Sequence, residues 1–492
     1  MNIIKIHPDD NVAVALCDIA AGTELSAEGT EVTALTDIKR GHKIALCEIK
    51  EGSPVIKYGN EIAVAKEDIK KGEWVHTHNA KTALSENAEY KYDHAEYPLP
   101  SVTKHTFMGF KRPDGKSGVR NEIWIIPTVG CVNSIARELT EKNQDIVKGN
   151  VEGLYTFAHP FGCSQLGDDL ATTKKLLAAL VHHPNAGGVL VLSLGCENLT
   201  PDMFREALGE VDSDRVRFLV CQDVSDEIEE GSKLLHELAE YAGKFHREEL
   251  PASELVIGMK CGGSDGLSGI TANPAVGRFS DRLIALGGTT MLTEVPEMFG
   301  AEKLLFNRCK DRSVFDKAVK MVDDFKHYFT SHGQVVYENP SPGNKAGGIT
   351  TLEDKSCGCV QKGGSAQIVD VLSYAEPVTK KGLNLLSGPG NDLVSATDLT
   401  AAGAQIILFT TGRGTPFGAP APTLKISTNT ALYEKKSGWI DFNAGTAAEG
   451  ESLDVLGDRL LDLVCAVASG KKTKTEERGF REIAIFKDGV TL

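Results

Sequence analysis

The sequence predicts an α/β protein, with a small all-β module at the N-terminus and a large α/β region of mostly parallel, Rossmann-like sheets. Two observations lead to this prediction. Residues 1–80 repeat a short turn-and-strand unit, whereas from residue 104 onward apolar, strand-like runs alternate with helical segments. Strands that alternate with helices favour parallel sheets with right-handed crossovers. We expect a β module at 1–80, a linker at 81–103, a second domain of α/β type at 104–250 and a catalytic α/β domain at 251–492.

Composition narrows the function classes. The 492 residues are 41% hydrophobic and carry a net charge of −15, which argues against a nucleic-acid-binding protein. No apolar run approaches the roughly 20 residues of a membrane-spanning helix, and the N-terminus lacks the apolar core of a signal peptide. The 11 cysteines have no disulfide-scaffold spacing and are typical of cytosolic thiols, metal ligands or core residues. We therefore expect a cytoplasmic protein without membrane or nucleic-acid partners.

The N-terminal module contains an internal repeat. The pattern (Asp/Glu)-Ile-x-x-Gly occurs at 18–22, 37–41, 48–52 and 68–72, and three copies precede a short alternating run. Each unit indicates a turn that leads into a strand. The last run ends in His76 and His78, which would share one face of a strand. Paired imidazoles can bind a metal or an anion or act as acid and base, although two solvent-facing histidines would show the same spacing.

Residues 81–103 are polar and contain two prolines, which is typical of a linker. A hairpin follows over 107–127, with its turn at 113–115. It carries four cations, which suit a carboxylate ligand or are simply solvated hairpin charges: Lys111, Arg112, Lys116 and Arg120.

The remaining elements follow from periodicity and turn signals. Strands are expected at 151–158, 188–194, 216–220, 255–259, 289–292, 383–386 and 406–409. Helices are expected at 170–182, 225–245, 275–286, 312–329 and 452–469, and the tail from Arg481 has strand character.

The loops after these strands hold most of the polar chemistry. Residues 255–269 form an apolar run followed by a glycine-rich loop, as at the carboxyl ends of strands in open α/β sheets. Four such loops contain a thiol, at Cys163, Cys196, Cys261 and Cys359. Each alone is as easily a buried core residue, but thiolates and imidazoles together favour iron or zinc over magnesium. There is no phosphate-binding fingerprint for ATP or NAD, so no nucleotide cofactor is expected.

Several long motifs resemble one enzyme family. FAHPFGCSQLGDD, LGCEN, CGGSDGLSGITANP, TEVPEMFGAE, YENPSPGNKAGGITTLEDKS and TTGRGTPFG are similar to the altronate/galactarate dehydratase family along the whole chain. The resemblance implies that the first module is a SAF-like β-clip domain. It also implies dehydration of D-altronate to 2-keto-3-deoxy-D-gluconate in hexuronate catabolism, with Fe²⁺ required and Mn²⁺ as its substitute.

Dehydration of an aldonate removes the C2 proton and expels the C3 hydroxyl, which requires a base, an acid and electrostatic stabilisation of the enediolate. The proposed catalytic residues are His76, His78, Lys260 and Lys345. The proposed substrate-binding residues are Arg120, Ser264, Asp265, Asn344, Asn391 and Arg413. The proposed metal ligands are His159, Cys163, Cys196 and Cys359.

Three alternatives remain open from the sequence. The chain could be a related lyase that acts on galactarate or a sulfonated hydroxy acid. It could be a hydro-lyase with an iron–sulfur cluster, or a sugar-acid-binding protein without activity. The expected partner is a small sugar acid, or a related hydroxy acid in the first alternative, and a homo-oligomer is compatible with the sequence.

Overall fold

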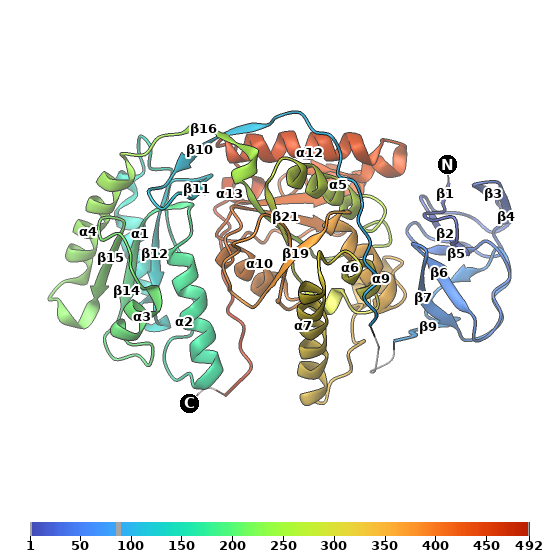
Figure 1. Cartoon of the computed structure of the whole chain (residues 1–492), viewed down its shortest axis with the longest axis horizontal. Helices are drawn as coiled ribbons and strands as arrows, with labels where there is room; N and C mark the ends of the chain where they lie inside the picture. The colour runs from blue at the N-terminus through green and yellow to red at the C-terminus, as the bar shows by residue number, and fades with distance from the viewer. Residues whose placement is uncertain (1, 85–89, 491) are drawn as a thin grey trace.

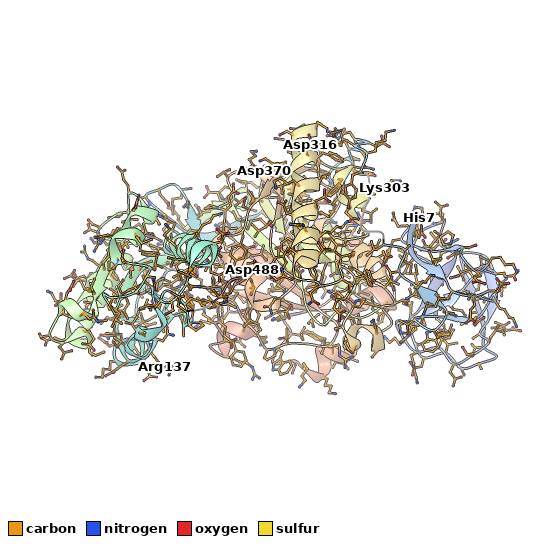
Figure 2. All side chains as sticks on the ribbon, turned by 90° about the horizontal axis from the view of Figure 1, so that it is seen from below. His7, Arg137, Lys303, Asp316, Asp370 and Asp488 are labelled. Carbon is orange, nitrogen blue, oxygen red and sulfur yellow. The ribbon has the colours of Figure 1, made fainter. Side chains whose placement is uncertain are left out.

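The computed structural model describes residues 2–84, 90–490 and 492, so residues 85–89 of the expected linker lie outside the described residues. Three units lie side by side in Figure 1, with the C-terminal α/β unit between the β module and the second α/β unit. The side chains of Figure 2 show the same arrangement, with His7 on the β module and Arg137 at the opposite end. Within the described residues, no helix is both long and apolar enough to cross a membrane.

The β module consists of three small sheets, and the internal repeat explains how they are joined. Ile19 bridges Ile38 and Ile49 bridges Ile69, so the four repeats pair two by two. The glycine that ends each repeat has a φ between 75° and 87°, which favours glycine and closes the turn. The sheets are β1-β2-β5-β8, β3-β4 and β6-β7-β9. Their strands are β1 (Ile3–Ile4), β2 (Val12–Ala15), β3 (Glu24–Ala27), β4 (Thr30–Thr33), β5 (Lys43–Ala45), β6 (Pro54–Lys57), β7 (Asn60–Ala65), β8 (Trp74–Val75) and β9 (Ala80–Lys81).

The described part of the linker runs along the C-terminal unit before it reaches the second unit (Figure 1). Tyr92 donates a hydrogen bond to the carbonyl of Cys309 at 2.7 Å, and Ala95 donates to Asn307. Strand β10 (Thr106–Lys111) then pairs with β11 (Ser117–Gly118), which confirms the expected hairpin. It also pairs antiparallel with β16 (Glu248–Pro251), so the two chain segments that join the α/β units lie together.

The second unit is a parallel sheet of order β13-β12-β14-β15, covered by helices on its faces. Its two central strands, β12 and β14, are rich in apolar residues and are entirely buried, as expected of a parallel sheet, whereas the outer strands are partly exposed. The elements are β12 (Glu122–Pro127), α1 (Asn133–Lys142), β13 (Gly153–Thr156), α2 (Gly167–Val181), β14 (Ala186–Ser193), α3 (Pro201–Leu208), β15 (Val216–Val220) and α4 (Glu227–Ala242).

The C-terminal unit is a seven-stranded parallel sheet of order β19-β20-β18-β17-β21-β22-β23. Its strands are β17 (Val256–Cys261), β18 (Thr289–Leu292), β19 (Ile368–Leu372), β20 (Gly382–Leu386), β21 (Ile406–Thr411), β22 (Thr423–Ser427) and β23 (Phe442–Asn443). Its helices are α5 (Ala272–Ala285), α6 (Glu302–Phe306), α7 (Arg312–Ser331), α8 (Pro342–Ala346), α9 (Leu352–Cys359), α10 (Asp392–Ala401), α11 (Thr430–Lys435), α12 (Leu453–Ala468) and α13 (Lys474–Glu477).

Two expectations about elements are wrong. The tail from Arg481 forms no strand in its described residues; it packs as an extended segment, and Ile483 and Ile485 are buried in the core of the second unit. The strand at the end of the β module stops at Val75. The backbone then turns, because the N–H groups of Asn79 and Ala80 both donate to the carbonyl of His76. His76 and His78 therefore do not share a strand face.

Candidate active site

Strand β17, at the centre of the seven-stranded sheet, ends in Lys260 and Cys261. Lys260 is fully buried; its ammonium lies 2.7 Å from Asp392 Oδ1, at the start of α10, and 3.3 Å from Glu294 Oε1. The backbone N–H of Cys261 donates to Glu294 Oε2 at 2.9 Å. Glu294 follows β18 and has a φ of 71°, a strained conformation for a side chain of this size. This turn directs its carboxylate toward the end of the neighbouring strand.

Cys261, Glu297 and Cys359 form a buried triad. The Glu297 Oε2 atom lies 3.0 Å from the sulfur of Cys261 and 3.1 Å from that of Cys359, and the two sulfurs are 3.5 Å apart. In the described part of the chain, this is the one group of three or more His, Cys, Asp or Glu side chains close enough to hold a metal ion together. Two thiols and a carboxylate form a donor set that suits iron or zinc.

Three lysines lie around this triad: Lys260, described above, Lys355 and Lys362. Lys355 lies 2.6 Å from Glu297 Oε1, and Lys362 lies 3.2 Å from Glu294 Oε2. Burial opposes ionisation of Glu297, but Lys355 and Lys362 lower its pKa to about 2. The hydrogen bond with Cys261, together with burial, raises the pKa of Cys359 well above its ordinary value.

The charges of this cluster balance in two states. Three lysines (Lys260, Lys355 and Lys362) face three carboxylates (Glu294, Glu297 and Asp392) while both thiols are protonated. If both thiols lose their protons, a divalent cation restores the balance. A buried cluster without net charge avoids most of the desolvation cost of a lone ion, so the residues present fit a divalent metal.

The glycine-rich loop after β17 brings several expected substrate-binding residues together. Asn344 donates to the carbonyl of Ser264 at 2.8 Å, and Arg413 donates to the carbonyl of Gly343 at 3.3 Å. Asp265 is half-buried; loss of water around its carboxyl raises its pKa, and it accepts hydrogen bonds from Ser268 and Thr428. Asn391 is exposed and caps α10, directly before the Asp392 that pairs with Lys260.

The β module docks against this region through a buried pair of ion pairs. Lys43 and Lys57 lie 2.7 and 3.0 Å from the two oxygens of Asp354, on α9. The three side chains are at most 3% exposed. The backbones also meet closely, because a β carbon on Gly266 would lie 1.9 Å from the carbonyl oxygen of Gly41. Glycine is required at such a contact.

Tyr58 extends from the hairpin of β6 and β7 toward the triad. A β carbon on Gly269 would lie 2.2 Å from its hydroxyl, so this glycine makes room for the ring. A cavity of about 10 Å³, room for roughly one water, remains between Tyr58, the Ser264–Gly269 loop, Asp354, Lys355 and Cys359. The β module therefore covers one side of the triad.

The three other expected catalytic residues occupy different environments. His76 is buried, and its Nδ1 lies 3.0 Å from the hydroxyl of Thr350, whose backbone N–H donates to Asp354. Burial, with Lys43 nearby, lowers the pKa of His76 to about 4. His78 is exposed, with its ring 4.8 Å from that of Trp74. Lys345 is half-buried on α8, next to Asn344.

The structure does not bring the expected metal ligands together. His159, Cys163 and Cys196 lie in the second unit, where the His159 ring contacts the carbonyl of Pro127 and Cys196 accepts from Gln222. Cys359 instead ends α9 and joins Cys261. The four expected ligands therefore form no group among the described residues.

Arg120 is also remote from the triad. Its guanidinium is buried against Glu476 and three backbone carbonyls, where it joins the second and C-terminal units. This environment gives Arg120 a structural contact in place of the expected substrate contact.

Sequence reasoning missed most of the charged partners. Glu294 and Glu297 lie in TEVPE, directly after an expected strand, and that position was the available signal. Asp354 and Lys355 lie on α9, and Lys362 lies just after it. The sequence pattern does not indicate which strands this helix packs against, so their ion-pair partners could not be predicted.

Family models match the chain over three stretches. Residues 1–83 match the altronate/galactarate dehydratase SAF domain, and residues 109–243 match the second domain of D-galactarate dehydratase/altronate hydrolase. Residues 252–491 match the C-terminal domain of D-galactarate/altronate dehydratase.

Three enzymes with related sequences align with this chain over nearly their full length. The altronate dehydratases of Escherichia coli (strain K12) and Bacillus subtilis (strain 168) are 53% and 54% identical to this chain, and each alignment covers 100% of both proteins. The galactarate dehydratase (L-threo-forming) of Escherichia coli (strain K12) is 34% identical over 98% of this chain and 96% of its own length. With all three domains matched in order, the chain belongs to the altronate/galactarate dehydratase family.

Proposed function

We propose that this protein is a hydro-lyase that dehydrates D-altronate to 2-keto-3-deoxy-D-gluconate in hexuronate catabolism. The supporting observation is the buried cluster at the ends of β17 and β18, where Lys260, Cys261, Glu294 and Glu297 converge with Cys359. The full-length similarity to two altronate dehydratases favours altronate as the sugar acid.

Fe²⁺, with Mn²⁺ as its substitute, is the proposed cofactor, and Cys261, Glu297 and Cys359 are its proposed ligands. When bound, such an ion supplies Lewis-acid stabilisation of the charge that develops on the substrate carboxylate. The charge balance of the surrounding lysines and carboxylates supports a divalent ion at this place.

The lysines of the cluster provide fixed positive charge. Glu294 and Asp392 outweigh the effect of burial and raise the pKa of Lys260, so this side chain stays protonated at neutral pH. A protonated Lys260 cannot remove the C2 proton, but it can stabilise a substrate carboxylate or the enediolate. Lys345 and Arg413, which are more exposed, are proposed to contact the distal part of the sugar acid.

His76 is the proposed acid–base group from the β module. Burial lowers its pKa to about 4, so at pH 7 the imidazole is neutral, has no proton to donate and can act only as a weak base. Its contact with Thr350 connects it to Asp354, which lines the small cavity beside the triad. Among the described residues, His78 has no comparable link to this cavity, and we therefore favour His76.

Substrate entry on this side requires the β module to move. The cavity of about 10 Å³ cannot hold a six-carbon acid, because ligand pockets are on the order of 300 Å³ or more. We propose that the module withdraws from α9 to admit the substrate and then returns Lys57, Tyr58 and His76 to the site.

The test is anaerobic formation of 2-keto acid from D-altronate, with and without added Fe²⁺. Iron-dependent turnover of altronate, with little turnover of galactarate, would support the proposal. Faster turnover of galactarate would favour the second candidate, suggested by the galactarate-dehydrating relative. If neither acid reacts while iron is bound, the proposed activity is wrong.

Other expectations stay predictions. The cytoplasmic location, a homo-oligomeric state and the Rossmann-like relationship of the α/β units belong to the same proposal. The strand order β13-β12-β14-β15 of the second unit supports the last of these.

A further inference from the structure

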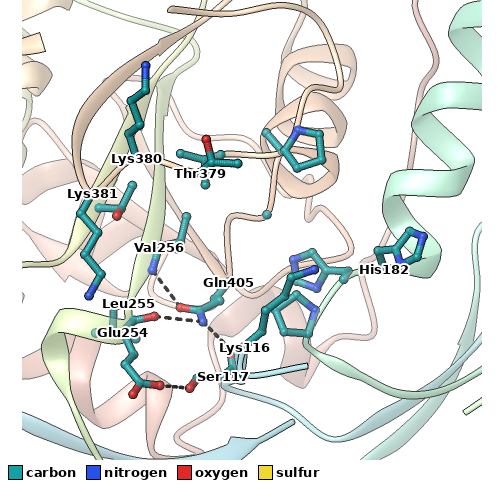
Figure 3. A pocket seen from close by; sticks show the side chains of 18 of the residues that line it. Lys116, Ser117, His182, Glu254, Leu255, Val256, Thr379, Lys380, Lys381 and Gln405 are labelled. Atoms are coloured by element: carbon teal, nitrogen blue, oxygen red, sulfur yellow. Dashed lines mark hydrogen bonds between the residues drawn. The ribbon is translucent and has the colours of Figure 1, made fainter. Parts of the chain in front are cut away.

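A second cavity, of about 370 Å³, lies between the second and C-terminal units (Figure 3). It is at the amino ends of the central strands, because its wall includes Val256 and Thr289, which begin β17 and β18. Val256 is four residues before Lys260, or roughly 13 Å at the rise of a strand. The cavity therefore lies at the opposite edge of the sheet from the candidate active site.

The cavity is held in shape by contacts between the two units. Gln405 accepts the backbone N–H of Val256 at 2.8 Å and donates to the carbonyl of Ser117, on the hairpin of the second unit. The hydroxyl of Ser117 donates in turn to Glu254. These contacts are drawn as dashed lines in Figure 3. Because β11 is tied to β17 in this way, the space between them is pre-formed.

The lining has an excess of positive charge. Four lysines line it (Lys111, Lys116, Lys380 and Lys381), and Glu254 is the single carboxylate among its lining residues. Lys111 pairs with Glu254 at 2.8 Å, and Lys380 pairs with Asp370 at 2.7 Å, outside the cavity.

Two of these lysines are free to meet a ligand. Lys116 approaches Asp114 only at 3.5 Å, and both side chains are more than half exposed, so this pair is weak. Lys381 donates to the carbonyl of Ser253 at 2.9 Å and forms no ion pair within the described residues.

The positive charge of the cavity comes from its lysines and not from its two histidines. Burial, with Lys116 as a further cause, lowers the pKa of His182 and lowers that of His183 to about 3, so both imidazoles are neutral at pH 7. They add no charge that would repel Lys116. Part of the remaining wall is apolar, with Pro184, Val378 and the turn at 401–403. A charged rim and an apolar wall are typical of sites for small organic ligands.

We propose that this cavity binds a small organic anion, whose negative charge is balanced by Lys116 on the second unit and Lys381 on the C-terminal unit and whose uncharged body packs on Pro184 and Val378. The ligand contacts both α/β units and stabilises their association. It is distinct from the sugar acid in the candidate active site, so the two sites are separable by mutation.

The test uses calorimetry on the full-length protein with two probes, succinate for carboxylates and glycerol 3-phosphate for phosphate esters. Neither is a strong metal chelator. We expect one probe to bind, and the double variant Lys116→Ala/Lys381→Ala to weaken binding by about tenfold or more, because two ionic contacts are lost. The matched control is Lys142→Ala/Lys233→Ala, which removes two exposed helix lysines and the same charge, and should bind as the unaltered protein does.

Other outcomes overturn the proposal. Absence of binding of both probes up to about 10 mM, a concentration that would detect even weak sites, excludes an anion site. Binding that persists in the double variant and is displaced by D-altronate belongs to the candidate active site instead. Because both lysines are exposed, the double variant is expected to fold, and an unchanged thermal unfolding midpoint without ligand checks this. The binding readout does not depend on the proposed activity.

Discussion

Lys43 of the β module and Asp354 of α9 form an ion pair of 2.7 Å, with side chains that are 0% and 1% exposed. Lys57 contacts the other oxygen of the same carboxylate. One carboxylate thus faces two buried ammonium groups at the boundary between the module and the C-terminal unit. Burial, with Lys57 nearby, lowers the pKa of Lys43 to about 8. The pairing holds the small cavity beside the triad closed.

Replacement of Asp354 tests this docking. Asp354→Ala leaves two buried ammonium groups without a carboxylate, although Lys43 still donates to the carbonyl of Gly348. Loss of one member of a buried ion pair costs about 3–5 kcal/mol. We expect a lower thermal unfolding midpoint, faster proteolysis of the linker and loss of turnover. Asp324→Ala, which breaks an exposed pair with Lys320 on α7, is the matched control and should change little. An Asp354 variant that unfolds like the control would contradict the docking role.

Serine substitutions test the metal ligands. Cys261→Ser and Cys359→Ser should each weaken Fe²⁺ binding by at least about tenfold, because a hard hydroxyl replaces a soft thiolate. The measurement is metal content after anaerobic loading, which does not depend on activity. Cys163→Ser and Cys196→Ser, in the second unit, serve as controls with the same chemistry. Loss of metal in the controls alone would return the site to the set expected from the sequence.

Because His76 is buried as a neutral ring, we expect the free energy of unfolding to fall at acidic pH. Its pKa is about 4 in the folded protein, against 6.5 for an ordinary histidine, so between these values the unfolded chain takes up a proton that folded His76 does not. The contribution of His76 is therefore present above about pH 6.5 and lost as the pH falls toward 4. His76→Gln should flatten the pH dependence of the unfolding free energy in this window. An unchanged pH dependence would show that His76 is not buried as a neutral ring.

Measurement of turnover also distinguishes the roles of His76 and His78. His76→Gln should lower kcat by a factor on the order of 10²–10⁴, as expected for loss of an acid–base group. His78→Gln alters an exposed ring and should retain most of the activity. The reverse result would assign the acid–base role to His78, which the sequence alone could not distinguish from His76.

Gly269 tests the approach of Tyr58. Its added β carbon would lie 2.2 Å from the Tyr58 hydroxyl and 2.6 Å from the Cα atom of Gly358, so Gly269→Ala forces the module away from α9. The expected cost is about 1–3 kcal/mol, with reduced turnover. Gly390→Ala is the control, because a β carbon there meets nothing within 4 Å although it lies two residues from Asp392. Equal activity of the two variants would show that the contact with Tyr58 is unimportant.

Local pattern determined most of the elements. The run Thr289–Leu292 became β18 and Val216–Val220 became β15 at the expected residues, because short runs rich in β-branched and apolar residues between helical segments favour strands of a parallel sheet. The four repeats of the β module placed a glycine where each turn needs a positive φ. The sequence also predicted that Ser264, Asp265, Asn344 and Arg413 belong to one site. Ser264, Asp265 and Arg413 lie in loops after expected strands, and Asn344 lies in a long polar connection.

Tertiary structure alone decided which strand ends meet. His159, Cys163, Cys196 and Cys359 share the same kind of loop chemistry, but the first three belong to a different sheet from the last. Cys359 meets Cys261 and Glu297 because α9 packs across the end of β17, while β18, its neighbour in the sheet, delivers Glu297. The sequence determined the strands and the reactive side chains; strand order and domain docking, which depend on contacts between residues a hundred or more positions apart, selected the side chains that form the site.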